Sequence, residues 1–372
     1  MDKLSVLIVG GGTGGHIFPG ISLYGELKAK GIKTAMLVGK KDVGFSPLSG
    51  ISKKDIFVYS APSFTKNIFL LPFFIINFFM AVFRSMMLLK KLKADSVIGM
   101  GGYVSAPALA AAGILKIPVF LCEQNSVPGK VTLLFAGRAK KIFTTFSTTK
   151  DYIKENLKHK VMHAGNPVRK NILTKKSREE AKKFFHLGHC KKVILVIGGS
   201  QGALQINELF MQIKQLYANE LKNTGVIWIT GDYSYKKFKE EIGSISTDGS
   251  MYLSPFIDEI GLAYKASNLT LSRSGAGGVM EFACFGLPSI LIPYPYAADN
   301  HQEKNAEEFE RAGAAIRVRK DEANPEKLGG IIADLLSNAN QLSRMAEKAK
   351  SLAKVNAAAD IVNAVIKEIK KK

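Results

Sequence analysis

Glycines and one histidine follow the first apolar run of the chain, in VLIVGGGTGGHIFPG at residues 6–20. Gly10, Gly12 and Gly15 have the spacing G-x-G-x-x-G between a predicted strand and a predicted helix, the setting in which this spacing binds a dinucleotide. Glycines let the backbone approach an anion, and a helix N-terminus offers N–H groups to a phosphate. His16 could act beside it as a base or hydrogen-bond donor near neutral pH. It could equally be an ordinary helix N-terminal residue bonded to the loop.

A dinucleotide cofactor needs a further residue that the chain lacks. In an NAD site, an Asp or Glu at the end of the second strand binds the ribose hydroxyls. Here the second predicted strand ends in LVGKKD, so that Gly39 and Lys40 occupy the place of the acid. The sequence therefore disfavours NAD, and the two lysines keep only an NADP site open.

Two later stretches repeat the plan of strand, glycine turn and helix. GGSQGA, residues 198–203, adds the Ser200 hydroxyl and the Gln201 amide to the backbone N–H groups of a turn. LSRSGAGGVMEFACFGLP, residues 271–288, starts a helix whose Glu281 could accept two hydrogen bonds from a ribose diol. Both helix starts suit a phosphate. The alternatives are a tight turn without a ligand for the first stretch and, for Glu281, a carboxylate that only complements the helix dipole.

Polar residues also gather after the last clear strand, PSILIPY. They are Asp299, Asn300, His301, Gln302 and Asn305. This density fits sugar hydroxyls, and it equally fits the start of an ordinary polar helix. HLGHC, residues 186–190, has the look of a metal site but no fourth ligand nearby, so we predict no metal there.

Strands and helices alternate along both halves of the chain, which predicts parallel sheets covered by helices. Each half has its own glycine-rich turn after its first strand. We therefore predict an α/β protein with two Rossmann-like domains facing each other across a cleft, with ligands beyond the carboxyl ends of the strands. The predicted domains are residues 1–165 and residues 166–345, followed by a C-terminal helix within 346–372.

The chain of 372 residues carries a formal net charge of +21, which predicts an anionic partner. It has no helix-turn-helix, zinc-finger or RNA-binding signature, so nucleic acid is disfavoured and an anionic membrane surface is favoured. The three cysteines lie far apart and give no disulfide framework, and the first residues read as a strand without a signal-peptide pattern. Together these features predict a cytoplasmic protein.

The apolar stretch NIFLLPFFIINFFMAVFRSMMLLKKLK, residues 67–93, is almost long enough to span a membrane. Pro72, Asn77 and Arg84 interrupt it, and the strand DSVIGM that follows must rejoin the same sheet, which argues against a span. Two interpretations remain: a crossover helix buried on one side, or a pair of helices whose exposed apolar face dips into an anionic bilayer. In the second, the apolar face is ringed by Lys66, Arg84, Lys90, Lys91 and Lys93.

The motifs in their order along the chain resemble those of the MurG family. They are GGGTGGHIFPG, GMGGYVSAPALAAA, EQN, GNPVR, GGSQGA, SRSGAGGVMEF and DNHQEKNA. Members of this family are bacterial transferases that add N-acetylglucosamine to the lipid-linked muramyl-pentapeptide precursor of peptidoglycan. The resemblance implies that the N-terminal half takes the lipid acceptor and that the C-terminal half holds UDP-N-acetylglucosamine. It also implies the architecture called GT-B, a C-terminal helix that packs back on the first domain, and a peripheral protein at the cytoplasmic face of the cell membrane.

The resemblance also implies roles for individual residues. His16 is expected beside the reaction centre, Ile257 at the uracil through its backbone, and Glu281 at the ribose. The other expected substrate-binding residues are Thr13, Gly14, Gly15, Asn125, Arg169, Ser200, Ala276, Gly277, Gly278, Val279, Met280 and Gln302. The sequence departs from the family pattern at Gly277, Gly278 and His301, so we do not count His301 among the contacts.

The implied reaction is an inverting transfer without a cofactor or a metal ion. The C4 hydroxyl of muramic acid attacks the anomeric carbon, and UDP leaves while helix N-termini receive its growing negative charge. The chain has no Asp-x-Asp pair, the usual handle for Mg²⁺ or Mn²⁺ in other sugar transferases. Two other classes of function compete. A UDP-N-acetylglucosamine 2-epimerase would not need the apolar run, and a non-catalytic nucleotide or lipid-headgroup module would leave His16 and Asn125 without a purpose.

Overall fold

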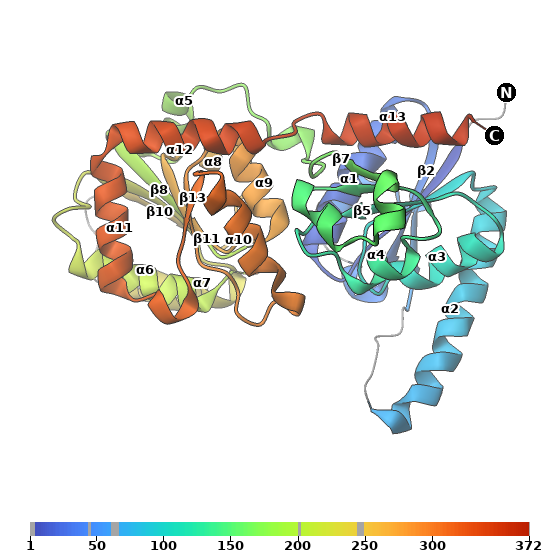
Figure 1. Cartoon of the computed structure of the whole chain (residues 1–372). Coiled ribbons are helices and arrows are strands. Elements are labelled where there is room, and N and C mark those ends of the chain that lie inside the picture. Colours follow the sequence, from blue (N-terminus) through green and yellow to red (C-terminus); the bar gives the residue numbers. More distant parts are fainter. Residues whose placement is uncertain (1–3, 44–45, 61–66, 200–201, 244–248, 372) are drawn as a thin grey trace. The chain divides into compact units, whose positions relative to one another are not determined.

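The computed structural model describes residues 4–43, 46–60, 67–199, 202–243 and 249–371. The chain divides into two compact units. The first consists of Met1–Arg169 and Lys354–Lys372, and the second of Lys170–Ala353. The last helix therefore belongs with the N-terminal part of the chain, and each unit is built around one parallel sheet (Figure 1).

Seven parallel strands form the sheet of the first unit, in the order β3-β2-β1-β4-β5-β6-β7. Short apolar runs make these strands, and β1, β4 and β5 are buried along their whole length, as is typical of strands covered on both faces. The strand order reverses between β1 and β4, which is where sheets of this kind bind ligands. The strands are β1 (Ser5–Val9), β2 (Lys33–Gly39), β3 (Ile56–Tyr59), β4 (Ser96–Gly99), β5 (Val119–Glu123), β6 (Ala139–Thr144) and β7 (Val161–His163).

Helices cover both faces of this sheet (Figure 1). On one face, α1 packs with the C-terminal helix α13, and Leu23, Leu27, Ile361 and Val365 join one apolar cluster. On the other face, α2 and α3 pack against each other over a second cluster. The helices of this unit are α1 (Gly14–Ala29), α2 (Leu71–Leu92), α3 (Ser105–Ile114), α4 (Lys130–Phe135) and α13 (Ala357–Ile369).

The second unit repeats the plan with six parallel strands in the order β10-β9-β8-β11-β12-β13. Phe210 of α6 and Phe238 of α7 pack against the fully buried Trp228 of β9. The strands are β8 (Lys192–Ile197), β9 (Thr224–Ile229), β10 (Met251–Ser254), β11 (Leu269–Ser272), β12 (Ser289–Leu291) and β13 (Ala315–Arg317). The helices are α5 (Arg178–Phe184), α6 (Leu204–Leu216), α7 (Asp232–Gly243), α8 (Ile260–Ala266), α9 (Ala276–Phe285), α10 (His301–Arg311), α11 (Pro325–Ser337) and α12 (Ala339–Leu352).

Helix α2 carries most of its apolar side chains on the surface. By length and composition it could cross a membrane, and only 17% of its most apolar window is buried. Its buried residues lie in the C-terminal half, and its N-terminal end extends away from the sheet (Figure 1). The chain leaves the sheet at β3 and rejoins it at β4, so α2 is a crossover within one sheet. The predicted pair of helices is wrong: a single helix follows the one-turn 3-10 helix η4 (Ile68–Leu70), and Lys66 lies outside the described residues.

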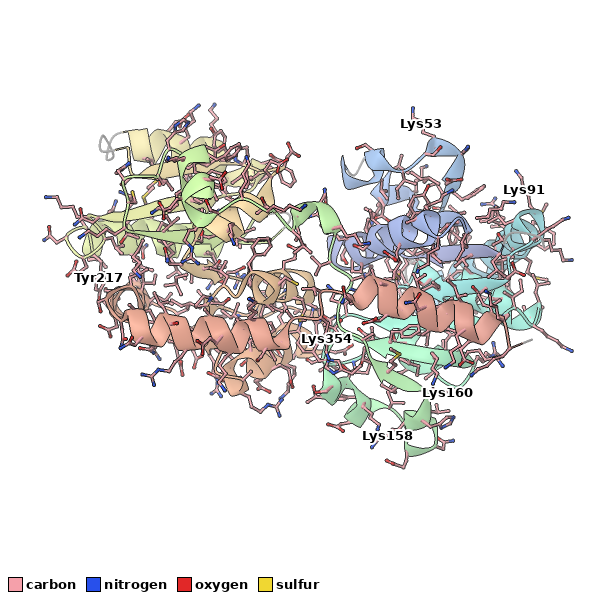
Figure 2. All side chains as sticks on the ribbon, turned by 90° about the horizontal axis from the view of Figure 1, so that it is seen from above. Lys53, Lys91, Lys158, Lys160, Tyr217 and Lys354 are labelled. Atoms are coloured by element: carbon pink, nitrogen blue, oxygen red, sulfur yellow. The ribbon has the colours of Figure 1, made fainter. Side chains whose placement is uncertain are left out.

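Positive charge is spread over the first unit. Lys53, Lys91, Lys158 and Lys160 project at separate places on its surface (Figure 2). Local attraction to anions must therefore come from smaller groups of residues, such as Arg84, Lys90, Lys91 and Lys93 in and after α2.

Candidate active site

His16 lies in the first turn of α1, and its ring is tied to the residue that begins the helix. Thr13 is the N-cap of α1, and a threonine there usually binds a backbone N–H of the first turn. Here the Thr13 side chain makes no such capping bond, and its hydroxyl lies 3.0 Å from Nδ1 of His16. This contact fixes the plane of the imidazole and the direction in which Nε2 points.

A second glycine turn, Gly101–Gly102 after β4, forms the wall beside this ring. Both glycines have positive φ, +86° and +71°, which L side chains rarely adopt. A Cβ on Gly101 would lie 3.1 Å from Nε2 of His16, and a Cβ on Gly102 would lie 3.1 Å from the carbonyl oxygen of Gly11. The two glycines therefore leave room for the imidazole and for the close approach of the first glycine turn.

A carboxylate closes the other side of the first glycine turn. Asp42 belongs to the 3-10 helix η1 (Lys40–Asp42) after β2, and it is buried. Its two oxygens lie 2.9 and 3.0 Å from the backbone nitrogen of Gly12, and Oδ2 also accepts a hydrogen bond from the Gly39 N–H at 3.0 Å. The turn is therefore held between Asp42 and the Gly101–Gly102 turn.

The loop after β5, which contains the EQN motif, is built around the buried carboxylate of Glu123. One oxygen accepts from the backbone N–H of Asn125, and the other from the Gly129 N–H and the Thr132 hydroxyl. Burial raises the pKa of Glu123 above its ordinary value, and these hydrogen bonds oppose that rise. Glu123 therefore fixes the loop that carries Asn125, which is itself half-buried.

Arg169 lies against the helix of His16. Its guanidinium carbon is 4.1 Å from the centroid of the Phe18 ring, and Phe18 follows His16 by two residues on α1. Thr13, Gly14, Gly15 and His16 thus lie together at the start of α1, and Arg169 packs on the same helix through Phe18.

In the second unit, the glycine turn after β8 is closed by its own packing. A Cβ on Gly198 would lie 2.2 Å from the backbone nitrogen of Ala203, and one on Gly202 would lie 2.3 Å from the carbonyl oxygen of Thr230. These two glycines are required whether or not a ligand binds. Ser200 and Gln201 lie outside the described residues.

The start of α9 offers backbone N–H groups and few side chains. Gly275 is its N-cap, and the first N–H groups of any α-helix lack an intrahelical acceptor. The side chains of Val279 and Met280 are 0% and 3% exposed, and the Val279 N–H donates to the Gly275 carbonyl oxygen at 3.1 Å, so neither side chain is open to a ligand. A Cβ on Gly277 would meet nothing within 4 Å, and one on Gly278 would approach only the Phe282 ring, at 3.7 Å. The larger residues of the family pattern would therefore fit there.

Glu281 is held by a tyrosine that the sequence analysis did not single out. The Tyr264 hydroxyl donates to Oε2 of Glu281 at 2.7 Å. The Tyr264 ring is buried between Phe282 and Phe285, at centroid distances of 5.5 and 5.4 Å. A carboxylate held at one oxygen by a fixed donor is oriented, and Glu281 is half-buried within reach of solvent.

The remaining predicted residues follow β10 and β12, two strands that β9, β8 and β11 separate in the sheet. Ile257, after β10, is 7% exposed, which leaves its backbone as the part able to meet a ligand. Gln302, in the first turn of α10, accepts a hydrogen bond from the Tyr294 N–H at Oε1, 3.0 Å away. The ring of His301 is bonded to the Ala298 carbonyl through Nδ1, at 2.6 Å.

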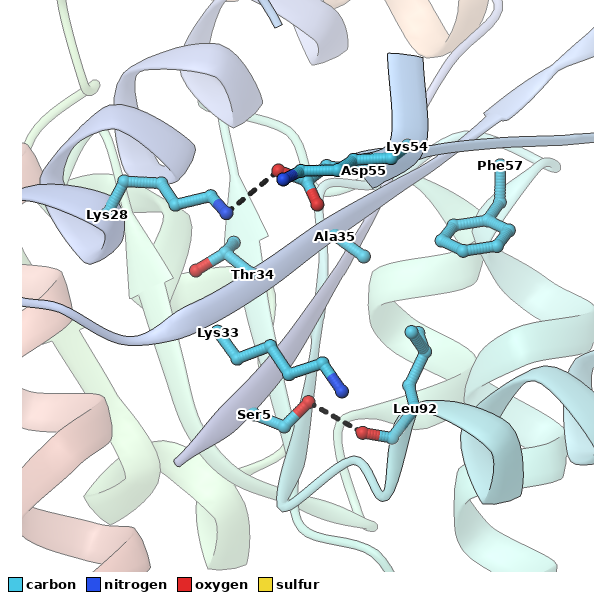
Figure 3. A pocket seen from close by; sticks show the side chains of 9 residues that line it. All are labelled: Ser5, Lys28, Lys33, Thr34, Ala35, Lys54, Asp55, Phe57 and Leu92. Atoms are coloured by element: carbon cyan, nitrogen blue, oxygen red, sulfur yellow. Dashed lines mark hydrogen bonds and ion pairs between the residues drawn. The ribbon is translucent and has the colours of Figure 1, made fainter. Parts of the chain in front are cut away.

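A cavity of about 330 Å³ lies away from these residues, at the edge of the first sheet where β1 and β2 begin (Figure 3). It is lined by Ser5, Lys28, Lys33, Thr34, Ala35, Lys54, Asp55, Phe57 and Leu92. Because the glycine turns follow the carboxyl ends of the strands, this cavity is separate from the candidate active site. Within the described ranges, no group of three His, Cys, Asp or Glu residues is placed to hold a metal ion.

Three residues around the site escaped the sequence analysis: Asp42, Glu123 and Tyr264. The position of Asp42 in the sequence could have indicated its role, because it stands three residues after the end of the second strand. An acid for a dinucleotide ribose was expected at that strand end, and Gly39 and Lys40 occupy the expected place. Glu123 lay inside the quoted EQN motif. Tyr264 lies 17 residues before Glu281 on another helix, and no local pattern joins the two.

Comparison with known proteins decides the family. The model of the glycosyltransferase family 28 N-terminal domain matches residues 6–144, and that of the C-terminal domain matches residues 193–364. A Halothermothrix orenii protein is 36% identical over 371 residues, covering 97% of this chain and 98% of its own length. Its name is UDP-N-acetylglucosamine--N-acetylmuramyl-(pentapeptide) pyrophosphoryl-undecaprenol N-acetylglucosamine transferase. This chain belongs to glycosyltransferase family 28. An Aquifex aeolicus relative with the same name is 33% identical over 343 residues, covering 92% of this chain and 95% of the relative.

Solved structures support the assignment to family 28. The crystal structure of MurG from Acinetobacter baumannii superposes with a TM-score of 0.76 at 27% identity, covering 98% of this chain and 100% of the other. The predicted resemblance to the MurG family and the fold class are confirmed. UDP-GlcNAc 2-epimerase from Neisseria meningitidis superposes with a TM-score of 0.70 at 16% identity, covering 98% and 100%, which shows a shared fold.

Proposed function

We propose that this chain transfers N-acetylglucosamine from UDP-N-acetylglucosamine to the C4 hydroxyl of the muramic acid in undecaprenyl-pyrophosphoryl-N-acetylmuramyl-pentapeptide, with inversion at the anomeric carbon. Relatives named for this transfer match the chain over nearly its full length, which supports the assignment. The observation that carries the mechanism is the imidazole of His16, which contacts the Thr13 hydroxyl and lies against the Gly101–Gly102 turn.

His16 is the proposed general base. With Nδ1–H donating to the Thr13 hydroxyl oxygen, Nε2 carries the lone pair that can accept the proton of the acceptor hydroxyl. The C4 oxygen then bonds to the anomeric carbon, the bond from that carbon to the β-phosphate oxygen breaks, and UDP leaves with the bonding electrons. A general base contributes about 10²- to 10⁴-fold to the rate.

The second unit holds the donor in this proposal. The N–H groups that begin α9, at Ala276, Gly277 and Gly278, donate hydrogen bonds to the pyrophosphate and stabilise the negative charge that grows on it as UDP departs. Glu281, oriented by Tyr264, binds the ribose hydroxyls. The backbone of Ile257 and the Gln302 side chain lie beside other strand ends of the same sheet and complete the donor site, with Ser200 as a further contact. Asn125 and Arg169 are further proposed donor contacts, as the resemblance to the family implies. Backbone dipoles supply this stabilisation, so the proposed step uses no metal ion.

Helix α2 provides the proposed contact with the membrane. Its N-terminal half exposes large apolar side chains, among them Phe73, Ile76 and Phe79, each more than half exposed, and Phe83 just beyond is equally exposed. An exposed apolar surface of this kind marks an interaction site, and basic residues beside it favour an anionic bilayer by about 1 kcal/mol each. A lipid-linked acceptor lies in such a bilayer, so α2 would bring the enzyme to its substrate as a peripheral protein of the cytoplasmic face.

One assay separates this function from its alternatives. Purified protein is incubated with radiolabelled UDP-N-acetylglucosamine and a muramyl-pyrophosphoryl lipid, and labelled lipid, free UDP and UDP-N-acetylmannosamine are measured. A transferase gives labelled lipid and equimolar UDP only when acceptor is present. Epimerisation without acceptor would replace the proposal with a 2-epimerase, and binding without turnover would indicate a non-catalytic module. His16→Ala should lower kcat by about 10²- to 10⁴-fold, and near-normal turnover would remove the base assignment.

A further inference from the structure

The first glycine turn is bound by a carboxylate of the protein itself, that of Asp42. Asp42 is 7% exposed, and both of its oxygens lie within hydrogen-bond distance of the Gly12 nitrogen. A Cβ on Gly11 would lie 2.2 Å from Oδ2 of Asp42, so glycine at this position is required by the carboxylate. The absence of a side chain at position 11 is therefore explained by a residue of the chain itself.

The first glycine turn is also linked to His16, through the Gly101–Gly102 turn. The carbonyl oxygen of Gly11 packs on Gly102, and Gly101 packs on Nε2 of His16. The Ser105 hydroxyl lies 2.9 Å from the Val9 carbonyl oxygen and 2.6 Å from that of Gly101, which ties the second turn to the end of β1. A shift of the first turn would therefore move both the start of α1 and the space around the imidazole.

We propose that Asp42 is a positioning residue for His16. The Gly12 N–H is donated to Asp42, so the buried carboxylate holds the first glycine turn in place. The turn in its place then fixes the space around the imidazole. This inference rests on the proposed function only for the role of His16.

The test compares Asp42→Ala and Asp42→Asn with Asp55→Asn. Asp55 ends the 3-10 helix η3 (Lys53–Asp55) and pairs with Lys28 at 2.8 Å (Figure 3). It also accepts a hydrogen bond from the Tyr24 hydroxyl at 2.7 Å. It is a carboxylate of the same sheet at the opposite edge, so its loss controls for a general loss of stability. Asp42→Ala should lower kcat by about 10- to 100-fold because small misplacements of a catalytic group have effects of this size. Asp42→Asn should be intermediate because its amide oxygen can still accept from the Gly12 N–H. Asp55→Asn should stay within about twofold of the wild type on the same reasoning.

Michaelis constants separate positioning from substrate binding. The KM values for donor and acceptor should stay within about threefold of the wild type in Asp42→Ala, because the proposal removes no substrate contact. A changed acceptor KM at constant kcat would mean that Asp42 acts on acceptor binding and not on the catalytic step, and it would overturn the proposal. So would a kcat for Asp42→Ala within twofold of the wild type.

A double-mutant cycle gives a readout that a general structural defect would not give. Gly11→Ala alone should lower kcat because its Cβ collides with the carboxylate. In the Asp42→Ala background the collision with the carboxylate is gone and the 3.1 Å approach to the Gly39 nitrogen remains, so Gly11→Ala should cost less there than in the wild type. Additive losses would contradict the coupling. If the wild type forms no product, the proposed function fails, and the positioning role is tested by the NMR signals of the His16 ring. These signals should shift in Asp42→Ala and not in Asp55→Asn. Signals that shift in neither variant would refute the positioning role.

Discussion

Replacing Tyr264 by Phe removes one hydroxyl and leaves the aromatic packing of the ring intact. In the wild type this hydroxyl donates to Oε2 of Glu281 at 2.7 Å, and the ring packs edge-on against Phe282. The variant therefore tests whether the orientation of Glu281 contributes to nucleotide binding. UDP carries the ribose that Glu281 is proposed to bind, so UDP alone is a sufficient probe.

The expected magnitude follows from the state in which the bond is made. A hydrogen bond to a charged group contributes about 1.5–3 kcal/mol. This bond is already present in the free protein, so it cannot add its full strength to affinity. What it can add is the ordering of one side chain before UDP arrives, about 0.5–1.5 kcal/mol. We therefore expect the Kd of UDP to rise by roughly 2- to 13-fold in Tyr264→Phe.

Titration calorimetry with UDP measures this Kd without an acceptor and without turnover. Tyr217→Phe is the matched control, because the Tyr217 hydroxyl donates to the Glu326 carbonyl oxygen at 2.7 Å in the same unit and has no part in the candidate site. Tyr217→Phe should lose about 1 kcal/mol of unfolding free energy and Tyr264→Phe about 1.5–3 kcal/mol, and only Tyr264→Phe should weaken UDP binding. An unchanged Kd in Tyr264→Phe together with a clear loss in Glu281→Gln would refute the orientation argument. An unchanged Kd in both would refute the ribose assignment.

Three further outcomes follow from the structure. Gly101→Ala places a Cβ at φ +86° and 3.1 Å from Nε2 of His16. It should lower the unfolding free energy by about 1–2 kcal/mol, and it should change kcat by a larger factor than the donor KM. Unchanged kinetics would mean that the imidazole does not act from this position. Phe79→Asp in α2 should reduce co-sedimentation with phosphatidylglycerol vesicles by roughly tenfold or more while turnover with a water-soluble acceptor analogue is kept, and equal sedimentation would remove α2 as the membrane contact. Burial alone would raise the pKa of Asp55, but hydrogen bonds from Lys28 and Tyr24 outweigh it and hold the pKa below the ordinary value. The stabilisation by the Asp55 carboxylate is therefore present above the pKa that Asp55 has in the unfolded chain, and it is lost as the pH falls. The difference in Tm between the wild type and Asp55→Asn should shrink between about pH 5 and pH 3. A difference that grew on acidification would contradict the predicted direction of the pKa shift.

The outcome for helix α2 shows how far a hydropathy pattern reaches. The run of apolar residues predicted either a buried crossover or an exposed pair of helices, and the structure has one crossover helix with an exposed N-terminal half. Hydropathy gave the length of the apolar segment. It could not say which part packs on α3, because that depends on where the sheet ends beneath the helix.

The sequence by itself determined the elements that lie next to one another along the chain. Each apolar run followed by glycine predicted a strand and a turn, and the turn placed Thr13 and His16 three residues apart at the start of one helix. These are local relations, so the backbone geometry of a single strand–turn–helix unit is enough to produce them.

Only the tertiary structure decided which distant residues hold that unit in place. Asp42 reaches Gly12 across 30 residues, and Tyr264 reaches Glu281 across 17. The first contact depends on the register of β1 against β2, and the second on the packing of α8 against α9. A sequence pattern specifies that such elements form and which face each one buries. The atom at which two of them meet is set only when the whole sheet and its covering helices pack together.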